Sequence, residues 1–370
     1  RQYAWEERGR QMREFFTKRS GMKVLYLFAG KRKALYEAYL AGEAPDNLLL
    51  GLNHLPKLGI TAAFLENRCT ELFRKISFNV TQLPAIAACL RYDVVFSGSG
   101  LLALFFVKRI LRRKKPYWFL YNTYFANLLK RNTKGLKSRI VRSALRSADG
   151  IISTSRAQNE VLAGAGVDLH KLHFIPEGVD EAFFSHNDVA AKTDLSEAYI
   201  MSAGRDIGRD YPTLLEAIRG VEISLVIGAL PRNFPGVSSF PANVRVSYFA
   251  PREYRAAICG ASFMVITTVS SEHTRGSDST GLYVLLESMM LGKAVIVTDR
   301  AEFRDYFKDG ENGIVVPAND SGALRRAIVY LSRHPEEARR MGEKNRKWVR
   351  EHATTKRFAA SIAELWKKTA

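Results

Sequence analysis

Two short stretches of the chain combine residue types that bind phosphate and hydroxyl groups. In the first, a short apolar run leads into Gly204, and Arg205 and Arg209 follow four residues apart. Glycine at the end of a strand lets another group approach the backbone closely, and guanidinium groups bind phosphate oxygens through paired hydrogen bonds. Two arginines in such a loop can therefore hold a diphosphate. The alternative is a solvated loop whose arginines pair with the neighbouring Asp206 and Asp210.

The second stretch, Gly281–Asp299, has the pattern of a loop, a short amphipathic helix and a buried strand. Apolar residues recur at helical spacing, and Glu287 lies off that stripe. Thr280 and Gly281 stand just before the helix, where backbone N–H groups are unpaired and the helix dipole favours an anion. Phosphate at the helix start and ribose on the carboxylate would together hold a nucleotide. The alternative is an ordinary helix–strand unit with a surface glutamate.

Alternating strand and helix patterns must position these two stretches, and they predict two parallel α/β units. In the first unit we expect strands at Lys23–Phe28, Leu48–Gly51, Ile60–Phe64, Asp93–Phe96, Tyr117–Tyr121 and Gly150–Ser153, with helices at Leu101–Arg113 and Phe125–Ala148. In the second unit we expect strands at Ala198–Ala203, Ile223–Ile227, Val244–Ser247, Ser262–Thr267, Ala294–Val297 and Gly313–Val316, with helices at Tyr211–Arg219, Arg252–Ala261, Ser321–Arg333, Pro335–Glu351 and Phe358–Lys368. A polar connector, Glu181–Glu197, separates the two units.

The composition is that of a globular protein with 370 residues, which is enough for two domains with substantial cores. No apolar run approaches the roughly 20 residues that a membrane-spanning helix needs. The stretch Arg1–Arg19 is charged and lacks the apolar core of a secretory signal, so we expect a polar helix there. The cysteines Cys69, Cys89 and Cys259 are odd in number and widely spaced, which predicts a reducing, cytoplasmic compartment rather than disulfides or a zinc site.

The positive charge is concentrated in the first half of the chain. The whole chain carries +19, and residues 1–180 hold 30 Lys and Arg against 14 Asp and Glu, a net charge of +16. The basic segments Lys108–Lys115 and Lys130–Arg146 interleave with apolar side chains. We expect this half to face a membrane, a nucleic acid or a phosphorylated substrate. The alternative is that these segments are solvated helix faces.

The order of these motifs along the chain resembles the retaining glycosyltransferases of the GT-B fold, and most of all their family four. The loop after Gly204, the stretch Ser279–Glu287 and the segment Glu311–Ile328 follow one another as in that family. In the first half, Leu145–Asp180 is similar to the family's segment that ends in a motif such as IPNGVD. The resemblance covers roughly Asp93 to Glu351. It implies two Rossmann-like parallel α/β domains that face each other across a cleft.

The resemblance also implies roles for individual residues. Arg205 and Arg209 would hold the diphosphate of a nucleotide-sugar donor, and Glu287 would bind the hydroxyls of its ribose. Four consecutive backbone amides would face the phosphates or the donor sugar: those of Thr280, Gly281, Leu282 and Tyr283. Arginines and the helix dipole, rather than a metal, would stabilise the leaving nucleoside diphosphate. UDP, GDP and ADP donors are not distinguished.

Two positions depart from the family's pattern. Ser279 stands where the family has a glutamate that contacts the donor sugar, and Asp278 beside it is a candidate substitute. Asn122 stands where the family often has a histidine. Asparagine can hydrogen-bond a sugar or a phosphate but cannot act as a general base. Retaining transfer can proceed without that base when the leaving phosphate accepts the acceptor's proton.

These observations predict a glycosyltransferase that moves a sugar to a hydroxyl of a glycan or lipid-linked acceptor with retention. We expect a helical extension at 1–21, an acceptor domain at 22–180, a donor domain at 181–351 and a last helix, 352–370, that crosses back to the first domain. The first domain would dock on an anionic membrane surface from the cytoplasm. His54, His173 and His273 are isolated, so none is expected to bind a metal.

Two alternatives from other functional classes remain open. A catalytically silent binding module with the same fold would explain Asn122 and Ser279. A nucleic-acid-binding protein would explain the sequence pI of about 9.9, although no zinc-finger or RNP-like signature accompanies the charge. We therefore expect no nucleic-acid partner.

Overall fold

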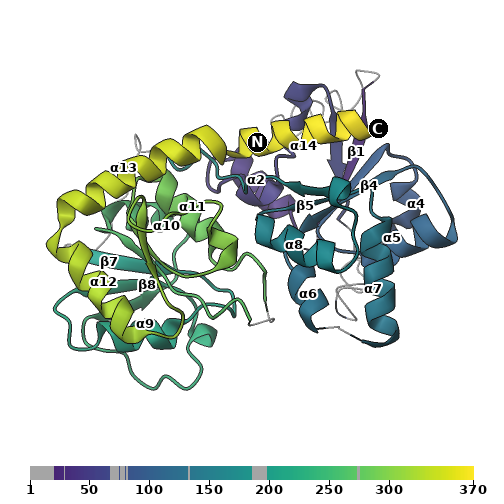
Figure 1. Cartoon of the computed structure of the whole chain (residues 1–370). Coiled ribbons are helices and arrows are strands. Elements are labelled where there is room, and N and C mark those ends of the chain that lie inside the picture. The colour runs from purple at the N-terminus through teal and green to yellow at the C-terminus, as the bar shows by residue number, and fades with distance from the viewer. Residues whose placement is uncertain are drawn as a thin grey trace.

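A computed structural model describes residues 21–28, 30–66, 75, 80, 82–131, 134–185, 198–272 and 276–370. Our predictions for residues 1–20, Cys69 and His273 lie outside these ranges. The described residues form two α/β domains that lie side by side, each with a parallel sheet and helices around it (Figure 1).

The first domain contains a six-stranded sheet with the order β2-β1-β3-β4-β5-β6, and every neighbouring pair is parallel. Its strands are β1 (Lys23–Leu27), β2 (Thr61–Phe64), β3 (Val94–Ser97), β4 (Tyr117–Asn122), β5 (Gly150–Ser153) and β6 (Leu172–Phe174). Its helices include α2 (Lys33–Leu40), α4 (Ile86–Cys89), α5 (Leu101–Phe105), α6 (Phe125–Arg131), α7 (Gly135–Ser147) and α8 (Arg156–Gly164).

The strands of this sheet are apolar on both faces because helices cover both sides. Along β1, Val24 and Tyr26 belong to one hydrophobic cluster, whereas Leu25 and Leu27 belong to the cluster on the opposite face. This alternation follows the two-residue period of a strand. It explains why the sequence shows these strands as continuous apolar runs.

The second domain repeats this architecture with the order β12-β11-β10-β7-β8-β9, again parallel throughout. Its strands are β7 (Tyr199–Ala203), β8 (Ser224–Gly228), β9 (Val244–Ser247), β10 (Met264–Ile266), β11 (Val295–Thr298) and β12 (Gly313–Val316). Its helices are α9 (Tyr211–Ile218), α10 (Pro251–Gly260), α11 (Leu282–Met290), α12 (Ser321–Arg333) and α13 (Pro335–His352).

The last helix, α14 (Thr355–Thr369), leaves the second domain and packs on the first (Figure 1). Its Trp366 is fully buried, with ring centroids 5.4 Å from Phe96, 6.2 Å from Tyr26 and 6.3 Å from Phe119. Where the chain crosses over, Thr355 N donates to the carbonyl of Val179 at 3.0 Å. The two domains are therefore joined at both the linker and the C-terminal crossing, while the exact boundaries that we predict stay predictions.

The structure corrects two predicted elements in the first domain. The expected strand Leu48–Gly51 is wrong, because this apolar run forms a 3₁₀ turn, Asn47–Leu49, and Leu50 then adopts a left-handed φ of 51°. The expected single helix Phe125–Ala148 is also wrong, because α6 and α7 are separate helices. Gly135 opens α7 with a φ of 86°, a conformation that favours glycine.

Candidate functional site

Loops at the carboxyl ends of the strands bring the loop with Arg205 and Arg209 together with the start of α11. Asp206, in the loop after β7, accepts hydrogen bonds from Thr280 Oγ1 at 2.7 Å and from Gly208 N at 2.8 Å through the same oxygen. Its other oxygen accepts from Ser277 N at 3.4 Å. The loop that carries Arg205 and Arg209 is therefore fixed against the start of α11, as a shared phosphate site would require.

Arg209 is a buried cation beside the start of α11, with only 6% of its surface exposed. Its Nη2 donates to Ser202 Oγ at 3.3 Å, and its guanidinium carbon lies 5.7 Å from the centre of the Tyr211 ring. Its Nε and Nη1 have no hydrogen-bond partner among the described residues. Two donors on one buried positive group call for an anionic acceptor.

Two glycines make room for this guanidinium. A Cβ atom at Gly204 would lie 2.8 Å from Arg209 Nε, and one at Gly281 would lie 2.9 Å from Arg209 Nη1. Both glycines also have positive φ angles, 140° and 88°. Any side chain at either position would therefore push Arg209 away from the end of β7 and from the start of α11.

Arg205 differs from Arg209 because its side chain is exposed. Its guanidinium lies 5.9 Å from the ring centre of Tyr248, which is itself exposed. Within the ranges that the structure describes, neither arginine forms an ion pair with Asp206 or Asp210. Asp210 instead caps α9 by accepting from Thr213 N at 3.1 Å. The alternative of a loop held by Arg–Asp pairs is therefore wrong.

Glu287 lies inside the protein rather than on the surface, so the alternative of a surface glutamate is also wrong. Its side chain comes from the middle of α11 and links the two domains. Oε1 accepts from Asn47 Nδ2 of the first domain at 2.8 Å, and Oε2 accepts from the Tyr254 hydroxyl of α10 at 2.9 Å. Burial raises the pKa of Glu287 to about 7, and these two hydrogen bonds act in the opposite direction.

Asp278 also joins the domains, through the start of α6. Its two carboxylate oxygens accept from the backbone amides of Ala126 at 3.0 Å and Asn127 at 2.9 Å. Burial raises the pKa of Asp278 to about 6, and these amide bonds lower it. The contacts give Asp278 a structural role between the domains, and its predicted contact with a donor sugar stays a prediction.

Ser279 and Asn122 meet at the same interface through residues around the start of α8. Ser279 Oγ lies 2.7 Å from Thr154 Oγ1 and accepts from Gln158 Nε2 at 3.3 Å. Asn122 is fully buried at the end of β4, where its Nδ2 donates to Ser153 Oγ at 3.2 Å. The structure thus brings the predicted residues of both domains together, although their roles toward a sugar stay predictions.

The predicted backbone amides at the start of α11 are not equivalent. Leu282 N already donates to the carbonyl of Ser279 at 3.0 Å, so it is engaged within the turn. The Tyr283 side chain also acts on the carboxyl of Glu177, whose pKa it lowers. The contribution of Thr280, Gly281 and Tyr283 amides to phosphate binding stays a prediction.

Glu177 is a buried carboxyl at the domain junction that our sequence analysis did not select. The Tyr121 hydroxyl donates to it at 2.5 Å, and its backbone amide donates to the Tyr306 hydroxyl at 3.0 Å. Burial raises the pKa of Glu177 to about 7, while the tyrosine hydrogen bonds lower it. The sequence could have indicated Glu177, because this glutamate replaces the asparagine of the IPNGVD-like motif.

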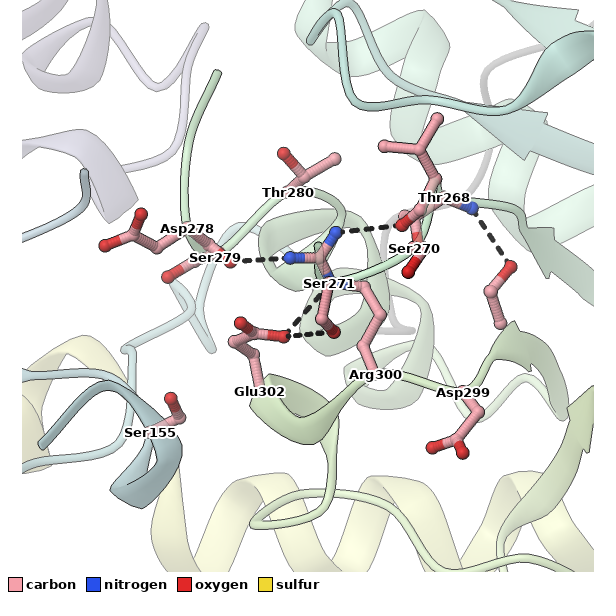
Figure 2. A network of polar contacts seen from close by, with 12 residues as sticks. Ser155, Thr268, Ser270, Ser271, Asp278, Ser279, Thr280, Asp299, Arg300 and Glu302 are labelled. Carbon is pink, nitrogen blue, oxygen red and sulfur yellow. Dashed lines mark hydrogen bonds and ion pairs between the residues drawn. The ribbon is translucent and has the colours of Figure 1, made fainter. Parts of the chain in front are cut away.

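Arg300 is a second buried arginine that the sequence analysis missed. Figure 2 shows its guanidinium between the carboxylate of Glu302 and the backbone of the loop before α11. Nε lies 3.2 Å from Glu302 Oε2, and Nη2 donates to the carbonyl of Asp278 at 3.1 Å. Nη1 donates to the carbonyl of Val269 at 3.2 Å. The signal that could have found Arg300 is its position two residues after the end of a buried strand, β11.

Among the residues that the structure describes, no group of three or more His, Cys, Asp or Glu side chains is arranged to hold a metal ion. No helix in the same residues is long and apolar enough to cross a membrane.

Two domains, each with a six-stranded parallel sheet and flanking helices, define the GT-B fold. Residues 242–348 match the family Glycosyl transferases group 1, and residues 41–183 match Glycosyltransferase Family 4. The chain therefore belongs to the GT-B glycosyltransferases of the family four type, which confirms the predicted family and fold.

Curated relatives match this chain in sequence over short stretches only. Phosphatidyl-myo-inositol mannosyltransferase of Mycobacterium leprae is 46% identical over 59 residues, which is 16% of either protein. D-rhamnosyltransferase WbpZ of Pseudomonas aeruginosa is 33% identical over 135 residues, or 35% of this chain and 34% of that relative. The matches thus span well under two thirds of these relatives.

Several solved structures match over 94% of this chain, and HepE and sucrose-phosphate synthase are among them. HepE of Anabaena, in complex with UDP and glucose, has a TM-score of 0.70 at 14% identity and is covered to 99%. Sucrose-phosphate synthase of Thermosynechococcus elongatus has a TM-score of 0.69 at 17% identity and is covered to 98%. At these identities the likeness concerns the fold.

Proposed function

We propose that this protein transfers a sugar from a nucleotide-sugar donor to an acceptor hydroxyl, with retention of configuration at the sugar. The observation that carries the proposal is Arg209, a buried guanidinium beside the start of α11, whose Nε and Nη1 have no hydrogen-bond partner among the residues that the structure describes. A diphosphate supplies the acceptor oxygens that these donors lack. Arg205, exposed on the same loop, would bind the diphosphate from the solvent side.

The nucleoside of the donor would lie along α11. Glu287 is on the same helix as the proposed phosphate site, one to two turns farther on, and each carboxylate oxygen has lone-pair capacity beyond the single bond that it accepts. We infer that the ribose hydroxyls donate to this carboxylate. Because the HepE complexes contain UDP and UDP-glucose, uridine nucleotides are the first donors to test.

In the transfer step, the bond between the sugar's anomeric carbon and the phosphate oxygen breaks, and the electron pair leaves with the nucleoside diphosphate. The acceptor oxygen forms the new bond to the anomeric carbon on the same face. Its proton passes to the leaving phosphate oxygen, so no side-chain base is needed at Asn122. Arg209, Arg205 and the dipole of α11 would stabilise the negative charge that develops on the diphosphate.

We further propose that the acceptor is a glycan or lipid-linked molecule and that the first domain docks on an anionic membrane surface from the cytoplasm. The net charge of +16 over residues 1–180 supports this, because each basic residue near an anionic leaflet contributes about 1 kcal/mol. The names of the mannosyltransferase and rhamnosyltransferase relatives are compatible with glycolipid or surface-polysaccharide synthesis.

The test is a thermal-shift panel of UDP, GDP and ADP sugars, because a ligand that binds only the folded protein stabilises it by mass action. We expect one nucleotide class to stabilise the wild type and to lose its effect in Arg205→Ala and Glu287→Ala. A folded sample that no donor stabilises would refute the proposal. Donor binding without transfer or donor hydrolysis above background would instead favour the silent module.

A further inference from the structure

A basic cavity lies on the first domain, at the edge of the sheet opposite the domain interface. It has a volume of about 570 Å³, and its lining includes the first residue of β4, Tyr117, as well as Asp149 just before β5 and Lys171 just before β6. These are the amino ends of the strands, whereas Asn122 ends β4 at the other edge. Five residue steps along β4 place the cavity about 16 Å from the proposed transfer site. It is therefore a separate site.

At the base of this cavity, Lys108 and Asp149 form an ion pair that carries no net charge. The side chain of Lys108 is only 8% exposed, and its Nζ lies 2.7 Å from Asp149 Oδ2. The same Nζ donates to the carbonyl of Lys114 at 2.7 Å, which holds the loop before β4 in place. Asp149 Oδ2 also accepts from Trp118 N at 2.6 Å. Asp149, the only carboxylate among the lining residues that the structure describes, is thus already paired.

The walls carry uncompensated positive charge. Five cations line the cavity and form no ion pair among the described residues: Arg109, Arg113, Lys114, Arg146 and Lys171. They come from two sides, since Arg113 precedes β4 and Arg146 lies in the last turn of α7. Converging cations around a preformed cavity suit a group with more than one negative charge and several acceptor oxygens, which describes a phosphomonoester.

Apolar side chains stand exposed next to the cavity in the sequence. Ile110 is 57% exposed and Leu111 is 40% exposed, directly after Arg109. Leu169, two residues before Lys171, is 76% exposed. Isolated exposed side chains of this kind are common, but here they flank the lining residues on two segments. This combination fits a charged headgroup in the cavity and acyl chains against the rim.

We propose that this cavity binds the phosphomonoester headgroup of an anionic lipid. The proposal rests on the proposed membrane docking of the first domain, and it assigns that docking to one site rather than to diffuse charge. It does not depend on sugar transfer. The preferred lipid is one whose headgroup phosphate carries close to two negative charges, such as phosphatidic acid, over a phosphodiester lipid of equal surface charge.

The test measures vesicle binding of the full chain at about 0.15 M ionic strength. Phosphatidylcholine vesicles carry either phosphatidic acid or phosphatidylglycerol, adjusted to the same surface charge. We expect tighter binding to the phosphatidic acid vesicles. The double variant Arg113→Ala/Arg146→Ala should weaken that binding roughly 30-fold, because two basic contacts are lost. The matched control, Lys137→Ala/Arg139→Ala, removes two exposed charges of α7 that do not line the cavity, and should weaken it less than roughly threefold.

Three results would overturn the proposal. An equal loss of vesicle binding in the two double variants would mean that the positive charge of the whole domain, rather than the cavity, binds the membrane. Equal binding of the wild type to both kinds of vesicle would mean that the cavity has no preference for a phosphomonoester headgroup. Unchanged vesicle binding in Ile110→Ser/Leu111→Ser, together with binding of free glycerol 3-phosphate as tight as the binding of the vesicles, would mean that the ligand is a soluble phosphomonoester rather than a lipid. The donor thermal shift is recorded for the same samples. A cavity variant that keeps the donor shift is folded, and absence of a donor shift in the wild type contradicts only the proposed sugar transfer.

Discussion

Replacing Arg209 by methionine should make the ligand-free protein more stable while it abolishes donor binding. The buried guanidinium leaves Nε and Nη1 unpaired among the described residues, and each such donor destabilises the fold by about 1–3 kcal/mol. The bond to Ser202 contributes about 0.5–1.5 kcal/mol and the contact with the Tyr211 ring about 0.5–1 kcal/mol in the opposite direction. We therefore expect Arg209→Met to raise the free energy of unfolding by about 1–3 kcal/mol.

The affinity for the nucleotide-sugar donor should fall in Arg209→Met, although the stability of the ligand-free protein rises. A hydrogen bond between a charged donor and a phosphate oxygen contributes about 1.5–3 kcal/mol, so the loss of two such bonds weakens binding roughly 10²- to 10⁴-fold. Calorimetric titration with the nucleotide that stabilises the wild type measures this change. A thermal scan of the ligand-free variant should show a melting temperature higher by about 2–4 °C for each kcal/mol gained.

Arg205→Met is the matched control, since the two arginines share a loop but differ in burial. Arg205 is exposed and contacts the Tyr248 ring, so its removal should change ligand-free stability by less than about 0.5 kcal/mol. It should still weaken donor binding, by roughly 10- to 100-fold. An Arg209→Met protein that is less stable than wild type and binds the donor equally well would show that Arg209 is a structural cation.

Two further predictions concern buried carboxyls at the domain junction. Asp278→Ala removes the acceptors for the amides of Ala126 and Asn127 in the first turn of α6, so unfolding in urea should show a loss of about 1–3 kcal/mol, and Asp278→Asn should recover part of it; a neutral result would mean that α6 does not need these acceptors. Glu177 has a folded-state pKa of about 7, above its ordinary value of 4.5, so the folded protein binds the extra proton and its stability falls as pH rises from about 4.5 to 7. Glu177→Gln should abolish up to about 3 kcal/mol of that fall, and parallel pH–stability curves for variant and wild type would contradict the assignment.

The fold was predictable because it follows from patterns that are local in sequence. Buried strands such as β4 appear as short apolar runs, and covered sheets need such runs on every strand. The same rule wrongly predicted a strand at Leu48–Gly51, because an apolar run does not reveal that Leu50 turns the chain through a left-handed conformation. Gly135, the first residue of α7, lies within a stretch whose helical pattern continues on both sides.

The site was predictable only where its chemistry is carried by neighbouring residues. Gly204 and Arg209 stand five positions apart, and their close contact agrees with the loop that we expected. The partners of Asp278 lie more than 150 positions away, and Asn47 lies 240 positions from Glu287. No local pattern indicates which of two distant polar side chains will meet, so these contacts could be seen only in the structure.

The bond between Asn47 and Glu287 also ties the proposed donor site to the arrangement of the domains. Asn47 accepts from the backbone amide of Asp180, at the end of the first domain, at 2.6 Å and donates to Glu287 at 2.8 Å, so it connects the end of the first domain to α11. Its donation favours the ionised form of Glu287, whose pKa burial raises to about 7. An ionised carboxylate is the stronger acceptor for ribose hydroxyls.

It follows that the affinity for a nucleotide sugar, whose diphosphate does not titrate near neutrality, should rise between about pH 6 and 8 as Glu287 ionises. In Asn47→Ala the carboxyl loses a partner that lowers its pKa, so the midpoint of this rise should move to higher pH. At neutral pH the affinity should then fall roughly 3- to 10-fold and recover in alkali. Glu287→Gln should bind weakly at every pH. An unchanged midpoint in Asn47→Ala would mean that Asn47 holds the domains together without acting on the donor site.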